Sequence, residues 1–143
     1  MKCLVLILLV LPIFSSEVAA NQNINDKRAK FNYQILCQGC HVGDGRGGKG
    51  VPNMKGRVGY FLSGQKGREY LVKVPGAANS ALDNDQLAEL LNWMMIEIGK
   101  KSTPADFAYF TAPEVERLRA SPLFEAQEYR KQLVKKLFPL AAQ

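Results

Sequence analysis

The feature that most constrains the fold of this chain is a five-residue segment, Cys37-Gln38-Gly39-Cys40-His41. Two thiols stand two residues apart, an imidazole follows the second at once, and this histidine is the only one in 143 residues. The C-x-x-C-H pattern is the attachment site for haem c. We therefore expect one covalently attached haem c, held by Cys37 and Cys40 and ligated by His41, with the rest of the chain folded around it.

The spacing of the motif has a physical reason. The two thiols add to vinyl groups on neighbouring pyrroles, and a two-residue gap lets both sulfurs reach the same porphyrin edge. His41 is then held beneath the iron, for which a neutral imidazole nitrogen is a good ligand.

Two other interpretations of the motif are weaker. A structural zinc site requires four ligands, and the sequence offers no second Cys/His pair. A thioredoxin-type redox pair belongs at a strand-to-helix junction, whereas here a helical pattern precedes the motif and glycines follow it.

The first 20 residues have the pattern of a secretory signal peptide. Lys2 gives a positive start, an apolar stretch runs from Cys3 to Phe14, and Val18-Ala19-Ala20 offers small residues before a cleavage site. The apolar stretch is too short to span a bilayer, although an uncleaved anchor is an alternative. We predict cleavage after Ala20 and a periplasmic location.

The mature chain is of a size that forms one core, to which a haem adds apolar surface. We predict an all-α fold in which short helices and loops at residues 21–101 form the haem domain. Residues 102–143 are expected to form a C-terminal helical extension packed on the same domain.

Local patterns predict two helices and a loop in the haem domain. Asp26 can cap a helix that runs to about Cys37 and delivers the cysteines. Five glycines between residues 43 and 50 predict a loop folded closely around the porphyrin edge. The clearest helix spans about Asp83 to Gly99, because Asp83 and Gln86 suggest a capping box and the apolar residues follow helical spacing, namely Leu87, Leu90, Leu91, Met94 and Ile98.

Over about residues 27–99 the chain resembles class I c-type cytochromes. The attachment motif is followed, in the order found in that family, by three segments: Gly50-Val51-Pro52-Asn53-Met54-Lys55-Gly56, Arg68-Glu69-Tyr70-Leu71, and residues 87–94. The resemblance implies a cytochrome c-like fold. It also implies that the Pro52 carbonyl accepts a hydrogen bond from the far ring nitrogen of His41, and that Met54 contacts the haem in place of a leucine.

The resemblance further implies that the last core helix crosses the first one. Trp93 lies on the last helix, and the aromatic residues Phe31 and Tyr33 lie on the first. We expect Trp93 to pack in the neighbourhood of both.

The chain departs from the family at the sixth iron ligand. Class I proteins take a methionine from the loop before the last core helix, but residues 74–82 contain none. We predict Met94, which directly follows Trp93 on the apolar stripe of its helix. The alternative ligands are Met54, Met95, a lysine, or no protein group at all. In that case Met94 would be a core residue that fills space and does not bind iron.

The sixth ligand bears on function. A haem closed by histidine and methionine excludes small molecules and suits electron transfer, whereas an open position would admit a gas or peroxide. Peroxide cleavage also requires a distal acid or base, and there is no second histidine. We predict a one-electron carrier, not an enzyme, acting between a periplasmic redox enzyme such as a dehydrogenase and a downstream acceptor. A gas-binding protein or peroxidase, and a cytochrome subunit of a larger redox complex, are the alternatives.

The charge pattern predicts an acidic redox partner. The formal net charge is +6, and residues 46–73 carry seven basic residues against the single acid Glu69: Arg46, Lys49, Lys55, Arg57, Lys66, Arg68 and Lys73. A basic surface near a haem edge would steer a negatively charged protein. Nucleic acid is not an expected partner, because the basic residues accompany a haem motif and no recognised nucleic-acid module.

The residues after 101 predict two further helices. Thr111 and Glu114 suggest a capping box for a helix to about Ala120, and Ser121-Pro122 opens a second helix. The apolar face of the second helix consists of Leu123, Ala126, Leu133 and Leu137, with Arg130 and three lysines on other faces. We expect this pair to pack over the haem domain. An arm that contacts a partner or a membrane surface is the less favoured alternative.

Overall fold

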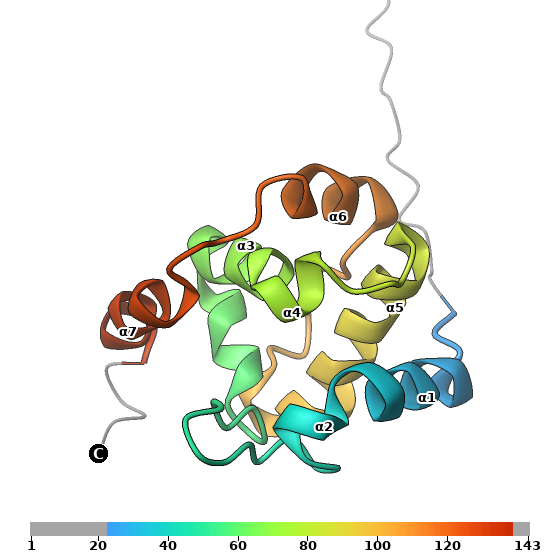
Figure 1. The fold of residues 1–143 in the computed structure, drawn as a ribbon, viewed down its shortest axis with the longest axis horizontal. Coiled ribbons are helices and arrows are strands. Elements are labelled where there is room, and N and C mark those ends of the chain that lie inside the picture. The colour runs from blue at the N-terminus through green and yellow to red at the C-terminus, as the bar shows by residue number, and fades with distance from the viewer. Residues whose placement is uncertain (1–22, 139–143) are drawn as a thin grey trace, which may run out of the picture.

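The computed structural model describes residues 23–138, which form an all-α fold with no β-strand in that range. The fold class predicted from sequence is therefore confirmed. Figure 1 shows the arrangement of the α-helices, with α6 at the top, α1 and α2 at the bottom, and α7 at one side. The elements in chain order are α1 (Asp26–Leu36), α2 (Gln38–His41), the 3₁₀ helix η1 (Val58–Ser63), α3 (Gln65–Lys73), α4 (Pro75–Ala78), α5 (Asn84–Met94), the π-helix η2 (Met95–Gly99), the 3₁₀ helix η3 (Lys100–Ser102), α6 (Ala112–Arg119) and α7 (Ala126–Leu137).

Helix α1 begins one residue earlier than a cap at Asp26 would place it. The side chain of Asn25 accepts a hydrogen bond from the Arg28 amide at 3.1 Å and caps the helix. Asp26 is instead the acidic residue of the first turn, where its charge favours the positive end of the helix dipole. The cap prediction was wrong because Asn and Asp cap equally well and the two stand side by side.

Helices α1 and α5 pack against each other, as the resemblance implied. Tyr33 and Trp93 lie with their ring centroids 5.7 Å apart, and Ala29 on the same helix as Tyr33 is fully buried. Phe31 does not join this contact: it is 57% exposed and faces away from the core. Two residues along a helix are about 200° apart around its axis, so Phe31 and Tyr33 cannot both face α5.

Helix α5 forms the centre of the core. Its cap is the predicted one, since the Asp83 side chain accepts a hydrogen bond from the Gln86 amide at 2.8 Å. Every residue of the helix from Leu87 to Met94 is buried. At Met95 the α-helix changes into the π-helix η2, which ends at Gly99 as predicted. A π segment inside a helix is rare and often marks a functional site.

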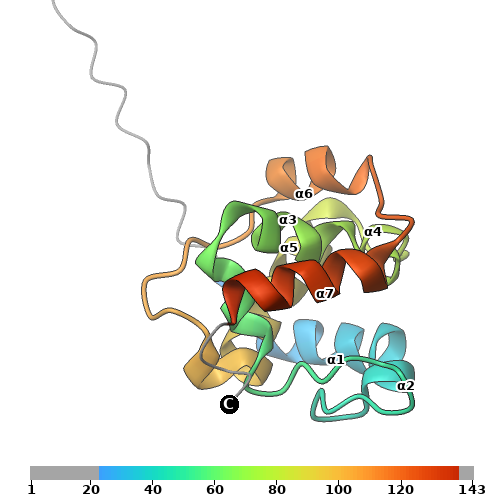
Figure 2. The ribbon, with the colours of Figure 1, turned by 90° about the vertical axis from the view of Figure 1, so that its left-hand side faces the viewer.

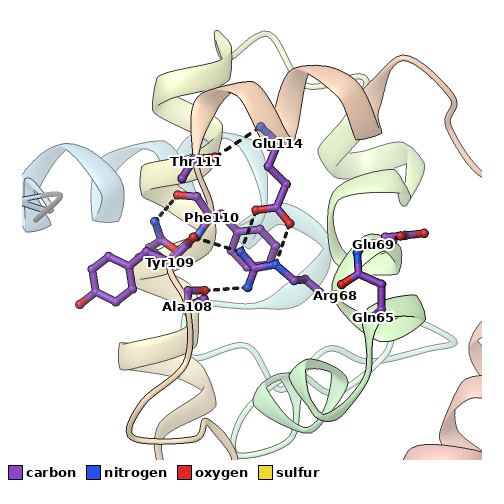
Figure 3. A network of polar contacts seen from close by, with 9 residues as sticks. Gln65, Arg68, Glu69, Ala108, Tyr109, Phe110, Thr111 and Glu114 are labelled. Atoms are coloured by element: carbon purple, nitrogen blue, oxygen red, sulfur yellow. Dashed lines mark hydrogen bonds and ion pairs between the residues drawn. The ribbon is translucent and has the colours of Figure 1, made fainter. Parts of the chain in front are cut away.

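Helix α6 is fastened to the core by polar contacts. Thr111 caps it, as predicted, by accepting a hydrogen bond from the Glu114 amide. Figure 3 shows Arg68 of α3 reaching Glu114 through two hydrogen bonds of 2.6 and 2.7 Å, and also reaching the Ala108 and Tyr109 carbonyls. In addition, the buried Asn92 side chain exchanges two hydrogen bonds with the Phe110 backbone.

Helix α7 lies across the side of the domain, as Figure 2 shows. It begins at Ala126, four residues after the Pro122 at which the sequence predicted it. The intervening segment is held instead by a 2.9 Å hydrogen bond from the Leu123 amide to the Lys73 carbonyl at the end of α3. That contact takes Leu123 out of the helical pattern.

No helix within residues 23–138 is long and apolar enough to cross a membrane. The predicted signal peptide, residues 1–20, lies outside the described part of the chain.

Candidate haem-binding site

The site is a cavity of about 370 Å³ enclosed by α2, α3, α5, α7 and the loop that follows α2. Its volume lies within the range of small-molecule and cofactor sites. The six residues that the sequence predicted for haem binding all line this one cavity: Cys37, Cys40, His41, Pro52, Met54 and Met94.

The attachment motif forms one short helical turn at the end of α1. The amides of Cys40 and His41 both donate to the Cys37 carbonyl, at 3.2 and 2.9 Å. Cys37 is half-buried and Cys40 exposed, and neither is in a disulfide. Burial raises the pKa of the Cys37 thiol, and the neighbouring Cys40 raises it further. Both cysteines line the cavity, so both thiols are available to bond a macrocycle held there.

His41 has the properties of an iron ligand. Burial lowers the pKa of its imidazole, with a smaller opposite effect from the Pro52 backbone, so the ring is neutral near pH 7. A neutral imidazole is the form that binds iron. The ring atom Nδ1 is buried and has no hydrogen-bond partner within ordinary geometric limits. The Pro52 carbonyl, expected to accept from this ring, is close enough to act on its pKa without completing that bond.

The glycine-rich loop carries Pro52 back to the histidine. The Gly47 amide donates to the His41 carbonyl at 2.9 Å, and the Met54 amide donates to the Gly45 carbonyl at 2.7 Å. Gly47 has a positive φ of 68°, and a β-carbon there would collide with the Val51 and Pro52 carbonyl groups. A side chain at this position would therefore push Pro52 away from the cavity.

Three methionines line the cavity. Met94 is 8% exposed, Met95 is fully buried, and Met54 is half-buried on the loop after α2. Met94 ends α5 and Met95 begins the π-helix η2. Successive residues of a regular α-helix point about 100° apart. The change from α-helix to π-helix falls between two neighbouring methionines that both line the cavity.

The loop between α4 and α5 is held by a residue that lies far along the chain. Here, where class I cytochromes carry their methionine, Arg119 of α6 donates to the carbonyls of Ala78, Ser80 and Leu82 at 2.7–3.0 Å. The hydroxyl of Ser80 is buried at the cavity wall and has no hydrogen-bond partner among the described residues. Sequence reasoning missed this clamp, since nothing in the local pattern links Arg119 to a loop that lies far earlier in the chain.

The cavity wall also includes three residues of α7 that sequence reasoning did not assign to the site: Ala126, Gln127 and Arg130. The apolar pattern of α7 predicts Arg130 on another face of the helix, away from the cavity wall. The signal that could have found it is its spacing, because Ala126 and Arg130 stand four residues apart and so share a helix face.

The donor set and the cavity fit a covalently bound haem. The wall is mostly apolar, both thiols of the motif line it, and a neutral imidazole lines it as well. These features define a protein that holds a haem through a C-x-x-C-H motif.

Comparisons with known proteins agree. No family model matches the chain. The chain is 32% identical to a cytochrome c-552 from Thermus thermophilus over 110 aligned residues, which cover 64% of this chain and 84% of that protein. A second cytochrome c-552, from Thermus thermophilus strain ATCC 27634 / DSM 579, is also 32% identical over 110 residues, and the alignment covers 74% of its length. The chain belongs to the c-type cytochrome family. It is an electron-transfer protein that carries haem c.

Proposed function

We propose that this protein is an exported, periplasmic monohaem carrier that receives one electron from a redox enzyme, such as a dehydrogenase, and passes it to a downstream acceptor. The observation that supports this most is the convergence of Cys37, Cys40, His41 and three methionines on one largely apolar cavity. Haem c supplies reversible one-electron exchange between ferric and ferrous iron. The protein's part is to anchor, ligate and enclose the haem.

Each residue of the attachment turn has a distinct role in the proposal. Cys37 and Cys40 bind the macrocycle through thioether bonds, and His41 offers a ring nitrogen to the iron. Pro52 orients the imidazole through its backbone, because a ring whose second nitrogen is directed to a carbonyl is fixed in tautomer and orientation. No side chain in this scheme donates or accepts a proton.

Met94 is the proposed sixth ligand. Its side chain is buried at the cavity wall, at the end of the helix that also packs on α1 through Trp93. A thioether ligand raises the reduction potential and closes the iron to small molecules. Met95 is fully buried and its carbonyl accepts a hydrogen bond from Thr103 at 2.6 Å, which ties its backbone to the segment after η3. Met94 is the last residue of α5 and lines the cavity.

The proposed docking surface is the basic loop beside the cavity. Lys49, Lys55 and Arg57 are exposed on the loop that also carries Pro52 and Met54. Lys55 and Arg46 share Asp44, at 2.9 and 2.6 Å, so part of the loop's charge is neutralised. Arg68 is removed from the predicted set, because it is paired with Glu114 and only 15% exposed. The partner would present acidic side chains to this loop.

Carbon monoxide binding tests the closed site. We expect the reduced holoprotein to show no change in its optical spectrum under carbon monoxide, because His41 and Met94 would both hold the iron. Rapid conversion of the wild-type spectrum to that of a carbon monoxide complex would contradict an electron carrier closed by a thioether. It would favour the gas-binding or peroxidase alternative.

A further inference from the structure

The C-terminal helix α7 forms part of the cavity wall. Ala126, Gln127 and Arg130 all line the cavity, and they lie close together near the start of the helix. The residues that predicted a class I core end at about residue 99, so this wall comes from outside the region of resemblance. The extension therefore contributes to the site itself.

The backbone of α7 is held firmly at this place. Leu133 is 5% exposed, and the Tyr129 ring stacks on the Tyr70 ring with centroids 6.2 Å apart. Beyond the helix end, the Phe138 ring meets Phe61 edge-on at 5.1 Å. Because residues on both sides of Arg130 are packed against the core, its Cα position relative to the cavity is fixed.

The guanidinium of Arg130 has no acidic partner among the described residues. Within residues 23–138 it forms no ion pair. The next residue, Lys131, behaves differently: it is exposed and pairs with Glu128 of the same helix at 3.3 Å. Arg130 is half-buried at a mostly apolar wall, so a counter-ion inside the cavity would stabilise its guanidinium.

The haem supplies a matching group. Its macrocycle is apolar apart from two propionate carboxylates on one edge, and a guanidinium binds a carboxylate through two parallel hydrogen bonds. Arg130 is the only arginine or lysine side chain lining the cavity among the described residues. We propose that Arg130 of the C-terminal extension pairs with a haem propionate; this inference rests on the proposed haem site.

The pairing has a consequence for the reduction potential. Ferric haem carries one more positive charge than ferrous haem, so a nearby cation destabilises the ferric form and raises the potential. Removing the guanidinium also leaves the propionate charge uncompensated, which stabilises the ferric form. Both effects act in the same direction, and α7 thus tunes the potential of the haem that it covers.

The test compares Arg130→Gln with Lys131→Gln in the holoprotein. Each variant removes one positive charge from neighbouring positions of α7. By spectroelectrochemical titration, we expect Arg130→Gln to lower the midpoint potential and Lys131→Gln to leave it close to that of the wild type. Arg130→Lys is expected to recover most of the potential but not the resonance Raman band of the guanidinium-bound propionate, because lysine keeps the charge and loses the planar fork.

Two controls separate the outcomes. Haem content and thermal unfolding, measured for every variant, establish that the haem is attached and that α7 remains folded. Equal midpoint potentials and equal propionate bands in Arg130→Gln and Lys131→Gln would overturn the pairing while leaving the haem site intact. A wild-type protein without covalent haem would instead overturn the proposed function.

Discussion

At the scale of single residues, a buried carboxylate joins two helices of the core through specific hydrogen bonds. The residue is Glu89. Its carboxylate, 9% exposed, accepts two hydrogen bonds from Arg28 at 2.7 and 2.9 Å and one from the Asn25 amide at 2.8 Å. Burial by itself would raise the pKa of Glu89, but these hydrogen bonds outweigh it and the pKa is lowered. The ionised carboxylate thus joins the start of α1 to α5.

This ion pair gives a pH-dependent prediction. A lowered folded-state pKa means that the stabilisation is complete above the unfolded pKa, about 4.3, and is lost as the pH falls through the folded value. Glu89→Gln should therefore cost about 1–3 kcal/mol of unfolding free energy at pH 7 and less near pH 3. Denaturant unfolding of the holoprotein at both pH values measures this, with the exposed Glu97→Gln as control. A cost that is equal at the two pH values would refute it.

Sequence patterns predicted the attachment turn but not the contacts between residues that lie far apart in the chain. Cys37, Cys40 and His41 could be assigned because their chemistry depends on local spacing alone. The clamp of Arg119 on the loop after α4 could not, because it depends on how α6 packs. The roles assigned to Met54 and Met94 stay predictions, since three thioethers reach the same cavity and sequence spacing does not rank them.

At the scale of elements, close approach of helices fixes the cavity wall. Gly67 of α3 is buried where α3 meets η1 and α7, and a β-carbon there would collide with the Phe61 carbonyl and lie 2.7 Å from the Leu137 side chain. Glycine at this position therefore sets the distance between the core and the C-terminal helix.

Gly67→Ala tests that close approach. We expect a loss of about 1–3 kcal/mol in unfolding free energy, because the added methyl must push η1 or α7 away. The matched control is Gly48→Ala on the loop after α2, where a β-carbon has no neighbour within 4 Å and φ is not positive. Equal unfolding free energies for the two variants would show that α7 does not pack on α3 in this way.

Element prediction from sequence succeeded where a cap and a periodic face coincided. Asp83 and Thr111 both cap the helices assigned to them. The start of α7 was placed too early, because Ser121-Pro122 has the composition of a helix start while the Leu123 amide is drawn to the Lys73 carbonyl. The π-helix at Met95 had no signal, since Met94 and Ile98 keep the four-residue apolar spacing that a regular α-helix also shows.

At the scale of the whole molecule, charge is unevenly placed. The basic loop after α2 lies at the opposite end of the domain from α6 in both Figure 1 and Figure 2. Lys49 and Arg57 are exposed on this loop, and Arg117 is exposed on α6. An electron donor or acceptor that approaches the cavity from the side of the loop would meet a positive field.

Small redox reagents test this steering without a known partner. Oxidation of the reduced holoprotein by ferricyanide, an anion, should slow as salt is added. The rate at low salt should fall by about 2-fold or more in Lys49→Gln with Arg57→Gln. Arg117→Gln should have little effect, because α6 lies at the far end. Equal slowing by the loop variant and by Arg117→Gln would show that net charge, and not the basic loop, governs the rate.

The most direct test of the account is the optical spectrum of the ferric holoprotein in three variants, Met94→Ala, Met95→Ala and Met54→Ala. A methionine bound to ferric iron gives a weak band in the red, and the account predicts this band in the wild type. It should disappear only in Met94→Ala, which should also begin to bind carbon monoxide when reduced. Persistence of the band in Met94→Ala, or its absence from the wild type, would contradict the proposed closed site.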